Sequence, residues 1–330
     1  MVIKISIKKK IASSNEPQTL PKQAEQDHTK PLDTSNQPSG YHPFIDKLSI
    51  VVTPLSEDAG DIFNNVWAQF AEKDVFQDAK AKWGPFKVAK WINLEKTNAR
   101  ALFQLAYVDK QVTKCRLEFN PRKVGQAGLM ELKADLTSIF NNGWEYVIEH
   151  GVVTRIDVAV DMPNARPGMF AILPQQGLTS KSWAVSGKLQ TFVLGKKKGN
   201  QTLLYNKKLE RLSKGQPWIG KSVARLERRL RHPPIVGLNG LHMLPNPFKA
   251  ILLTEIPTNH PPGEAKPWVW EMFKDCVIQR GLPGALALLP KEKRTLYRDH
   301  LKNHPHQLWD PVAIWKNWPA VVKQSELGLP

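Results

Sequence analysis

The sequence predicts an α+β protein in which an antiparallel β-sheet carries helices on one face and a small helical region follows at the C-terminus. Three observations lead to this class. The chain of 330 residues is 41% hydrophobic, which is enough to bury a sizeable core. Short β-like runs follow one another between residues 85 and 121 without helix-length segments between them, which favours antiparallel pairing. Two amphipathic helical segments accompany these runs in the first half of the chain.

Three regions follow from the composition along the chain. Residues 12–43 are rich in Ser, Pro, Gln, Asn and Asp and almost lack large hydrophobic residues, so residues 1–43 are predicted to be a flexible tail. Residues 44–256 hold the β-like runs and form the predicted main domain. From residue 257 tryptophans, prolines and helical segments dominate, and residues 257–330 are predicted to be a helical C-terminal region.

Hydrophobic periodicity assigns the elements of the main domain. Apolar residues at helical spacing predict the helices, and β-branched or alternating runs bounded by Pro, Gly and Asn predict the strands. A Gly-containing stretch at 141–143 predicts a break in the second helix. In chain order the prediction is a strand at 46–54, a helix at 58–73, strands at 85–94, 99–108 and 111–121, a helix at 128–151, and strands at 152–161, 181–187, 189–195, 201–207 and 222–231.

The net charge restricts the class of partner. The chain has 47 Lys and Arg against 30 Asp and Glu, a formal charge of +17. Such a balance indicates nucleic acid or an anionic membrane as partner. The alternative is that the positive charge serves solubility alone. Residues 188–231 contain thirteen of the Lys and Arg and two acids, so this segment carries +11 of the total. The polyanion-binding surface is therefore expected here.

Other features limit the location and the cofactors. No apolar run approaches the roughly 18 residues that span a bilayer, and the apolar segment at the start of the chain is too short for a signal peptide. A cytoplasmic protein without a membrane partner is therefore expected. Cys115 and Cys276 lie far apart without Cys or His at metal-ligand spacing, which predicts neither a disulfide framework nor a zinc site.

An arginine–aliphatic–acid pattern occurs three times, at 116–118, 155–157 and 225–227. In a strand the arginine and the acid of each copy share one face, so three such strands in one sheet can bring three or four carboxylates together. Clustered carboxylates need cations, which arginines can supply, or Mg²⁺ or Mn²⁺, since these ions prefer oxygen ligands. The alternative is a set of cross-strand arginine–carboxylate pairs on a solvated face.

Tyr205 lies within the basic segment, at the end of a predicted strand and next to Lys207 and Lys208. A tyrosine is a competent nucleophile, but its ordinary pKa of about 10 requires a metal ion or a lysine to favour the phenolate. A divalent ion would also polarise a phosphate under attack. The alternative for Tyr205 is an amphipathic strand residue with its hydroxyl at the rim of the sheet.

Three stretches in this order, "TRIDVAVD", "TFVLGKKKGNQTLLYNKK" and "ARLERRLR", resemble the replication initiation factor family of bacterial plasmids and filamentous phages. The resemblance spans roughly residues 44–240 and is strongest over 152–231. It implies a rolling-circle replication initiator: a DNA nicking-joining endonuclease that cuts one strand at an origin, becomes joined to the 5′ phosphate through tyrosine and frees a 3′ hydroxyl as primer. Members often carry an acid after the tyrosine, where this chain has Asn206, and a Gly-Ser-Arg-like turn, where this chain has Gly-Lys-Lys at 195–197.

The resemblance assigns candidate roles by position. Tyr205 takes the place of the nucleophile, and Lys207 and Arg225 are expected to neutralise the scissile phosphate. The carboxylates at the matching positions are candidate ligands of Mg²⁺ or Mn²⁺, and Glu118 joins them from strand geometry alone. The candidate metal ligands are Asp157, Asp161, Glu227 and Glu118. The candidate DNA-binding residues are Lys196, Lys197, Lys198, Lys208, Arg228 and Arg229.

Several alternatives remain open at this point. Origin DNA, as a supercoiled duplex or an extruded single strand, is the expected partner, with a host helicase or polymerase and a second copy of the chain as further candidates. A non-enzymatic DNA-binding regulator would use the same basic sheet and need no metal. An RNA-binding module is disfavoured because the basic strands show no stacked aromatic pair. The His-x-His metal motif of another class of nickases occurs only at 304–306, around a proline that makes a poor strand.

Overall fold

The computed structural model describes residues 41–72, 74–80, 84–173, 179–186, 188–235 and 237–328. The chain divides into two units, residues 1–38 and 39–330, and every element below belongs to the second. The predicted flexible tail, residues 1–43, lies outside the described residues except for its last three.

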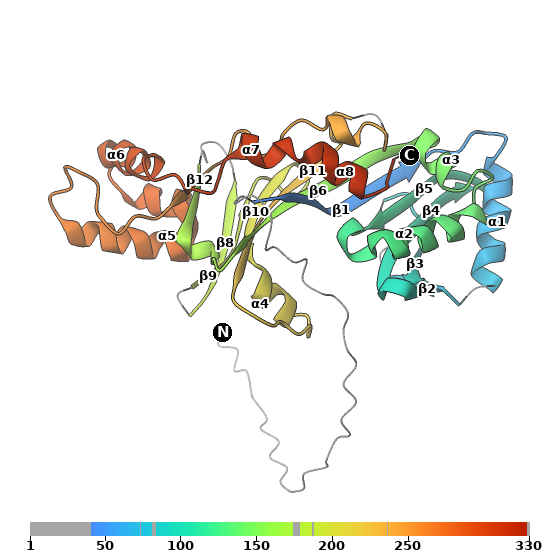
Figure 1. The fold of residues 1–330 in the computed structure, drawn as a ribbon, viewed down its shortest axis with the longest axis horizontal. Helices are drawn as coiled ribbons and strands as arrows, with labels where there is room; N and C mark the ends of the chain where they lie inside the picture. Colours follow the sequence, from blue (N-terminus) through green and yellow to red (C-terminus); the bar gives the residue numbers. More distant parts are fainter. Residues whose placement is uncertain are drawn as a thin grey trace, which may run out of the picture. The chain divides into compact units, whose positions relative to one another are not determined.

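An antiparallel sheet forms the centre of the second unit (Figure 1). Among the described residues it has ten strands in the order β2-β3-β4-β5-β1-β6-β11-β10-β9-β8, and β7 pairs with β12 in a separate two-stranded sheet. The strands are β1 (Pro43–Val52), β2 (Phe76–Asp78), β3 (Val88–Leu94), β4 (Ala99–Val108), β5 (Gln111–Phe119), β6 (Gly151–Pro163), β7 (Phe170–Leu173), β8 (Ser180–Val185), β9 (Lys188–Leu194), β10 (Gln201–Asn206), β11 (Val223–Arg231) and β12 (Leu252–Glu255).

The helices come before, between and after these strands. They are α1 (Ala59–Glu72), α2 (Pro121–Thr137), α3 (Trp144–His150), α4 (Lys207–Leu212), α5 (Pro267–Leu288), α6 (Lys291–Lys302), α7 (Pro311–Lys316) and α8 (Trp318–Gln324), with short 3₁₀ turns η1 (Glu95–Thr97), η2 (Pro167–Met169) and η3 (Leu241–Met243). No described helix is both long enough and apolar enough to cross a membrane. Together with the sheet, these elements confirm the predicted α+β class and its helical C-terminal region.

Strand alternation divides the sheet into an apolar and a polar face. In β6, Ile156, Val158 and Val160 are fully buried in the main hydrophobic core, which also contains buried side chains of α1, α2, α3 and α8. The intervening side chains, Arg155 and Asp157 among them, point to the opposite face. The apolar face therefore supplies the stability of the fold, and the polar face is the place to look for function.

The α2–α3 segment confirms one prediction and extends another. The predicted break at 141–143 is present, since α3 begins at Trp144 after Gly143, whose φ is 54°. However, α2 begins at Pro121, seven residues before the predicted start. The Asn120 side chain accepts a hydrogen bond from the Lys123 N–H and Pro121 occupies the first turn, a combination that favours helix initiation.

The C-terminal helices divide between two hydrophobic clusters. α5 and α6 pack with β7 in a smaller cluster that includes Trp270, Phe273 and Tyr297. α7 and α8 instead contribute Ile314 and Trp318 to the main core. The predicted boundary between residues 256 and 257 follows directly after β12, and the helices beyond it do not pack as one separate group.

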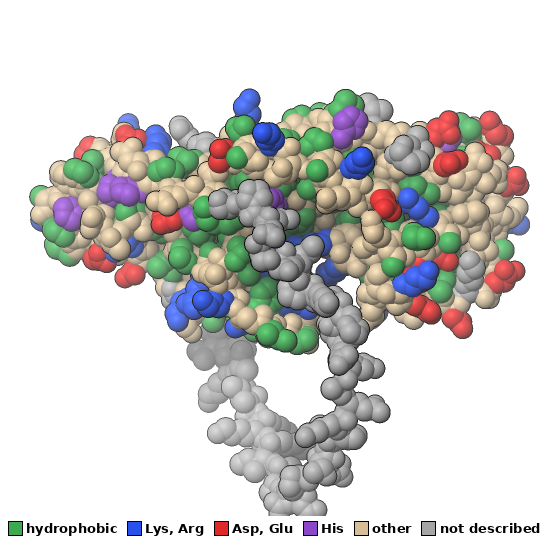
Figure 2. All heavy atoms as spheres, viewed as in Figure 1, with side chains coloured by type: hydrophobic (Ala, Val, Ile, Leu, Met, Phe, Trp, Pro, Cys, Tyr) green, Lys and Arg blue, Asp and Glu red, His purple; other side chains and the backbone are tan. Residues whose placement is uncertain are grey.

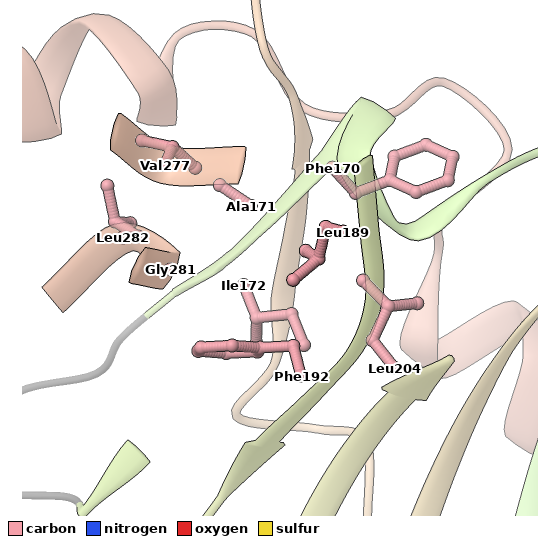
Figure 3. A pocket seen from close by; sticks show the side chains of 9 residues that line it. All are labelled: Phe170, Ala171, Ile172, Leu189, Phe192, Leu204, Val277, Gly281 and Leu282. Carbon is pink, nitrogen blue, oxygen red and sulfur yellow. The ribbon is translucent and has the colours of Figure 1, made fainter. Parts of the chain in front are cut away.

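A kink in α5 lies against the sheet. Gly281 interrupts the helix with φ 70° and ψ 166°, a backbone conformation that essentially only glycine adopts. Figure 3 shows the small apolar cavity beside it, which is lined by side chains of β7, β9, β10 and α5. Its volume of about 10 Å³ admits roughly one water molecule, so this cavity is a packing feature and not a ligand site.

Replacing Gly281 with alanine is expected to destabilise the fold by about 1–3 kcal/mol, because the backbone would be strained. A Cβ at this position would also lie 2.5 Å from the ring of Phe192. Urea unfolding measures the change. Gly168→Ala is the matched control, since a Cβ there meets atoms at 3.8 Å or more; equal unfolding midpoints for both variants would contradict the prediction.

Candidate functional site

Strand pairing brings the predicted site residues of three strands onto the polar face. β11 pairs with β6 so that Arg225 lies opposite Asp161 and Arg229 lies opposite Asp157. β10 pairs with β11 so that Tyr205 lies opposite Arg225. These residues are separated by up to 72 positions in the sequence, and it is the antiparallel register that places them side by side.

Tyr205 begins a continuous chain of polar contacts. Its hydroxyl donates a hydrogen bond to Glu227 Oε2 at 3.0 Å, and Arg229 Nε donates to Glu227 Oε1 at 2.6 Å. The same Arg229 nitrogen lies 3.7 Å from Asp157 Oδ2. Arg155 closes the chain with two hydrogen bonds to Asp157, at 2.8 and 2.6 Å. We call these five residues the tyrosine–carboxylate cluster.

Burial controls the electrostatics of this cluster. The Asp157 and Glu227 side chains are both 2% exposed. Burial raises the pKa of Asp157 above its ordinary range, Arg155 opposes this effect, and the nearby Glu227 raises the pKa further. Burial and then the charge of Glu227 also raise the pKa of Tyr205. The phenol is therefore held protonated, with a carboxylate in place to accept its proton.

A second group of residues, the Arg225 cluster, lies next to the first. Arg225 donates from Nε and Nη2 to Asp161, at 2.6 and 2.9 Å, and from Nη1 to Asp46, at 2.6 Å. Its guanidinium lies 4.7 Å from the centre of the Phe44 ring, and Arg122 lies 4.3 Å from the same ring. Arg122 also donates to Asp161 at 3.0 Å. Each guanidinium nitrogen of Arg225 thus has a carboxylate partner within the protein.

Glu118 lies on β5, two strands from β6, and has ion-pair partners of its own. It pairs with Lys47 at 2.9 Å and with Arg116 at 2.5 Å. Burial opposes its ionisation, but Lys47 and the two arginines Arg116 and Arg155 outweigh burial and lower the pKa of Glu118. The carboxylate is therefore stabilised as an anion by its own partners, as in a cross-strand ion pair.

The fit to a divalent ion rests on two of the four candidate ligands. Asp157 and Glu227 lie on either side of Arg229, whereas Asp161 pairs with Arg225 and Arg122, and Glu118 pairs with Lys47 and Arg116. Within the described part of the chain, no group of three or more His, Cys, Asp or Glu is placed to hold a metal. Arg155, Arg229 and Tyr205 occupy all four oxygens of these two carboxylates, so Mg²⁺ or Mn²⁺, which prefers oxygen ligands, would bind here only after displacing some of these donors.

The predicted lysines near Tyr205 are held by local contacts. Lys207 Nζ lies 5.8 Å from the centre of the Tyr205 ring and 2.8 Å from Glu210 Oε2. Lys208 Nζ donates to the carbonyl of Gly220 at 3.4 Å. Lys207 is thus next to the nucleophile candidate, as predicted, while Lys208 supports the loop that follows α4.

The remaining DNA-binding candidates divide between two faces and a turn. Arg229 belongs to the tyrosine–carboxylate cluster, but Arg228 points to the opposite face of β11, where it donates to the Thr202 hydroxyl. Sequence adjacency therefore does not place these two arginines on one surface. Lys196, Lys197 and Lys198 are exposed in the β9–β10 turn.

Three residues of the site escaped the sequence prediction: Asp46, Phe44 and Arg122. A register shift between Ile45 and Lys47 in the β1–β6 pairing turns Asp46 toward Arg225. Simple alternation from Lys47 would put Asp46 on the apolar face, so no sequence pattern reveals this contact. Arg122 comes from the start of α2, which the sequence prediction left outside the helix.

The His-x-His segment takes no part in either cluster. His306 Nδ1 lies 2.5 Å from Glu255 Oε1, and the Tyr41 hydroxyl lies 2.6 Å from His306 Nε2. Pro305 makes one isolated β-bridge to Thr254. These contacts join the segment to β12 and to the start of β1.

The polar face therefore defines a class of site: a buried tyrosine hydrogen-bonded to a carboxylate, with arginines beside it on a basic antiparallel sheet. Comparison with protein-family models and with curated proteins finds no match for this chain.

Proposed function

We propose that this protein is a rolling-circle replication initiator, an endonuclease that nicks one DNA strand and joins itself to the 5′ phosphate through Tyr205. The observation that carries the proposal is the 3.0 Å hydrogen bond from the Tyr205 hydroxyl to Glu227 within an arginine-rich cluster. The resemblance of the three strand motifs to the replication initiation factor family supports the same activity, and the cytoplasm is where it would meet replicon DNA.

The chemistry follows from the position of Glu227. Because the pKa of Tyr205 is raised, the phenol has to lose its proton as it attacks, and Glu227 is the base in contact. A bond forms between the tyrosine oxygen and phosphorus, the bond from phosphorus to the 3′ oxygen breaks, and the departing oxygen takes a proton from solvent. The products are a 5′ phosphotyrosine and a free 3′ hydroxyl.

Charge on the phosphate would be met by the arginines of the cluster. Arg229 is the more exposed of the two, with 34% of its side chain accessible against 16% for Arg155. Lys207 adds a cation beside the tyrosine ring. A divalent ion held by Asp157 and Glu227 would neutralise further charge on the phosphate. Arg225 is expected to hold Asp161 and Asp46 in position and not to bind the phosphate, since its nitrogens already bind these two carboxylates.

One observation favours a second candidate, a non-enzymatic DNA-binding regulator. Tyr205 is 9% exposed, and both carboxylates in its cluster have arginine partners. A sheet stabilised in this way can bind the DNA backbone without cleaving it. That protein would need no divalent ion, and its affinity would fall steeply with salt.

Covalent attachment distinguishes the two candidates. We expect the purified protein, incubated with a supercoiled plasmid that carries its origin and with Mn²⁺, to yield open circles with protein at a 5′ end. Nuclease and protease digestion followed by mass spectrometry should then identify a nucleotide on the peptide that contains Tyr205. Removing the metal ion with a chelator should abolish the formation of open circles with attached protein. Salt-sensitive binding to intact plasmid without any cut would support the regulator.

A further inference from the structure

The segment between β10 and β11, residues 207–222, forms an arm that begins two residues after Tyr205. It consists of α4 and the loop that follows it, and Figure 1 shows α4 apart from the other helices. Asn206 starts the arm, because its side chain accepts a hydrogen bond from the Leu209 N–H at 3.2 Å. The arm is therefore fixed at its base to the strand that carries the candidate nucleophile.

The arm exposes hydrophobic side chains that no core requires. Ile219 is 98% exposed, and Leu212 and Leu209 are 47% and 39% exposed. Figure 2 shows hydrophobic side chains over the position of α4. Beside Ile219, the Trp218 Nε1–H donates to the Lys221 carbonyl at 3.0 Å, and the Arg211 guanidinium lies 5.8 Å from the centre of its ring. These contacts hold the half-buried Trp218 ring in the loop, next to the exposed Ile219.

The charge around these side chains is strongly basic. The arm contains five Lys and Arg against the single acid Glu210, which Lys207 and Lys214 already neutralise. Burial lowers the pKa of Lys123 at the start of α2, and the charges of Lys207 and Lys214 lower it further. Basic groups of the arm and of α2 thus converge near the site.

An apolar tip with basic flanks is complementary to unpaired nucleic acid. Aromatic and aliphatic side chains stack on or insert between bases, and the flanking cations bind the phosphates. A paired duplex keeps its base faces stacked, so such a tip has nothing to stack on there. The fit is therefore to a single strand or to a locally opened duplex.

We propose that the arm binds unpaired bases next to the scissile phosphate, with Trp218 and Ile219 contacting the bases and the arm's lysines and arginines contacting the backbone. The position of these bases beside the cut rests on the proposed function of Tyr205. The affinity for single strands does not, because it follows from the arm's own exposed side chains and charge.

The test compares single-stranded and duplex binding in the full-length protein. Fluorescence anisotropy would measure binding to an oligothymidine of about 20 nucleotides and to a duplex of about 20 base pairs, long enough to cover one binding site, for the wild type and for Trp218→Ala and Ile219→Ala. A base stacked on an aromatic ring contributes roughly a 5- to 150-fold gain in affinity, so Trp218→Ala is expected to lose single-strand affinity within that range, and Ile219→Ala to lose a smaller part of it. Duplex affinity should change by less than about 2-fold, since phosphate contacts dominate it.

Met130→Ala provides the matched control, since Met130 is 63% exposed on α2, outside the arm. Unchanged single-strand binding in both arm variants, or equal losses for single strand and duplex, would overturn the inference. If the arm variants lose binding to phosphatidylserine vesicles while their DNA binding stays intact, the inference would be overturned as well, in favour of a membrane contact. Selective loss of single-strand affinity supports the proposed role of the arm even if no tyrosine adduct forms. A failure of this inference can therefore be told apart from a failure of the proposed nicking activity.

Discussion

Replacing Tyr205 with phenylalanine is expected to abolish nicking and 5′ attachment, a loss on the order of 10³-fold or more, because the attacking oxygen is removed. Duplex binding should stay within about 2-fold of the wild type, since phosphate contacts dominate it. The phenyl ring fills the same position, and Glu227 keeps its 2.6 Å hydrogen bond from Arg229. Conversion of supercoiled plasmid to open circles and a filter-binding assay measure the two properties in parallel.

The control for this prediction is Tyr107→Phe. Tyr107 packs edge-on against Phe63, away from the tyrosine–carboxylate cluster. The control should nick at the wild-type rate. If Tyr205→Phe loses binding as severely as nicking, the residue supports the fold or the DNA surface and is not the nucleophile. If it nicks normally, another group attacks the phosphate.

Local alternation predicted which side chains share a face in β6 and β11, but not in β1, where the register shift moves Asp46 to the polar face. The arginine–aliphatic–acid pattern placed Asp157 and Glu227 toward one side of their strands, and the structure brings them together with Tyr205. Register determines which carboxylates meet, and the pattern within a strand carries no register. Asp161 therefore faces Arg225, and Glu118 lies on β5, separated from β6 by β1.

The elements that escaped prediction are short or depend on tertiary contacts. β2, β7 and β12 have three or four residues each, too few for a periodic pattern. The segment before residue 128 contains Gly125 with φ 57°, which interrupts the helical pattern even though Asn120 starts the helix upstream. The packing of α7 and α8 on the main core depends on residues such as Trp318, whose partners lie far away in the sequence.

The second large effect is expected from Asp161→Asn, which should destabilise the fold by about 3–5 kcal/mol. Arg225 is 5% exposed, and the substitution removes the carboxylate that accepts two of its hydrogen bonds. Asp46 alone then compensates a buried guanidinium. Urea unfolding at neutral pH measures the loss. Asp299→Asn is the control, because its ion pair with Lys302 is about half exposed and should contribute less than about 1 kcal/mol.

The pH dependence of this effect separates an ionic from a steric cause. Burial opposes ionisation of Asp161, but Arg225 and Arg122 outweigh it and hold its pKa below the ordinary range. A lowered folded-state pKa contributes stability above the unfolded value, about 3.9, and this stability is lost as the pH falls through the folded value. The gap between wild type and Asp161→Asn should therefore be full at about pH 7 and narrow at increasingly acid pH below about 4. A gap that persists unchanged in acid would mean that the introduced amide disturbs packing and that the charge of Asp161 contributes little.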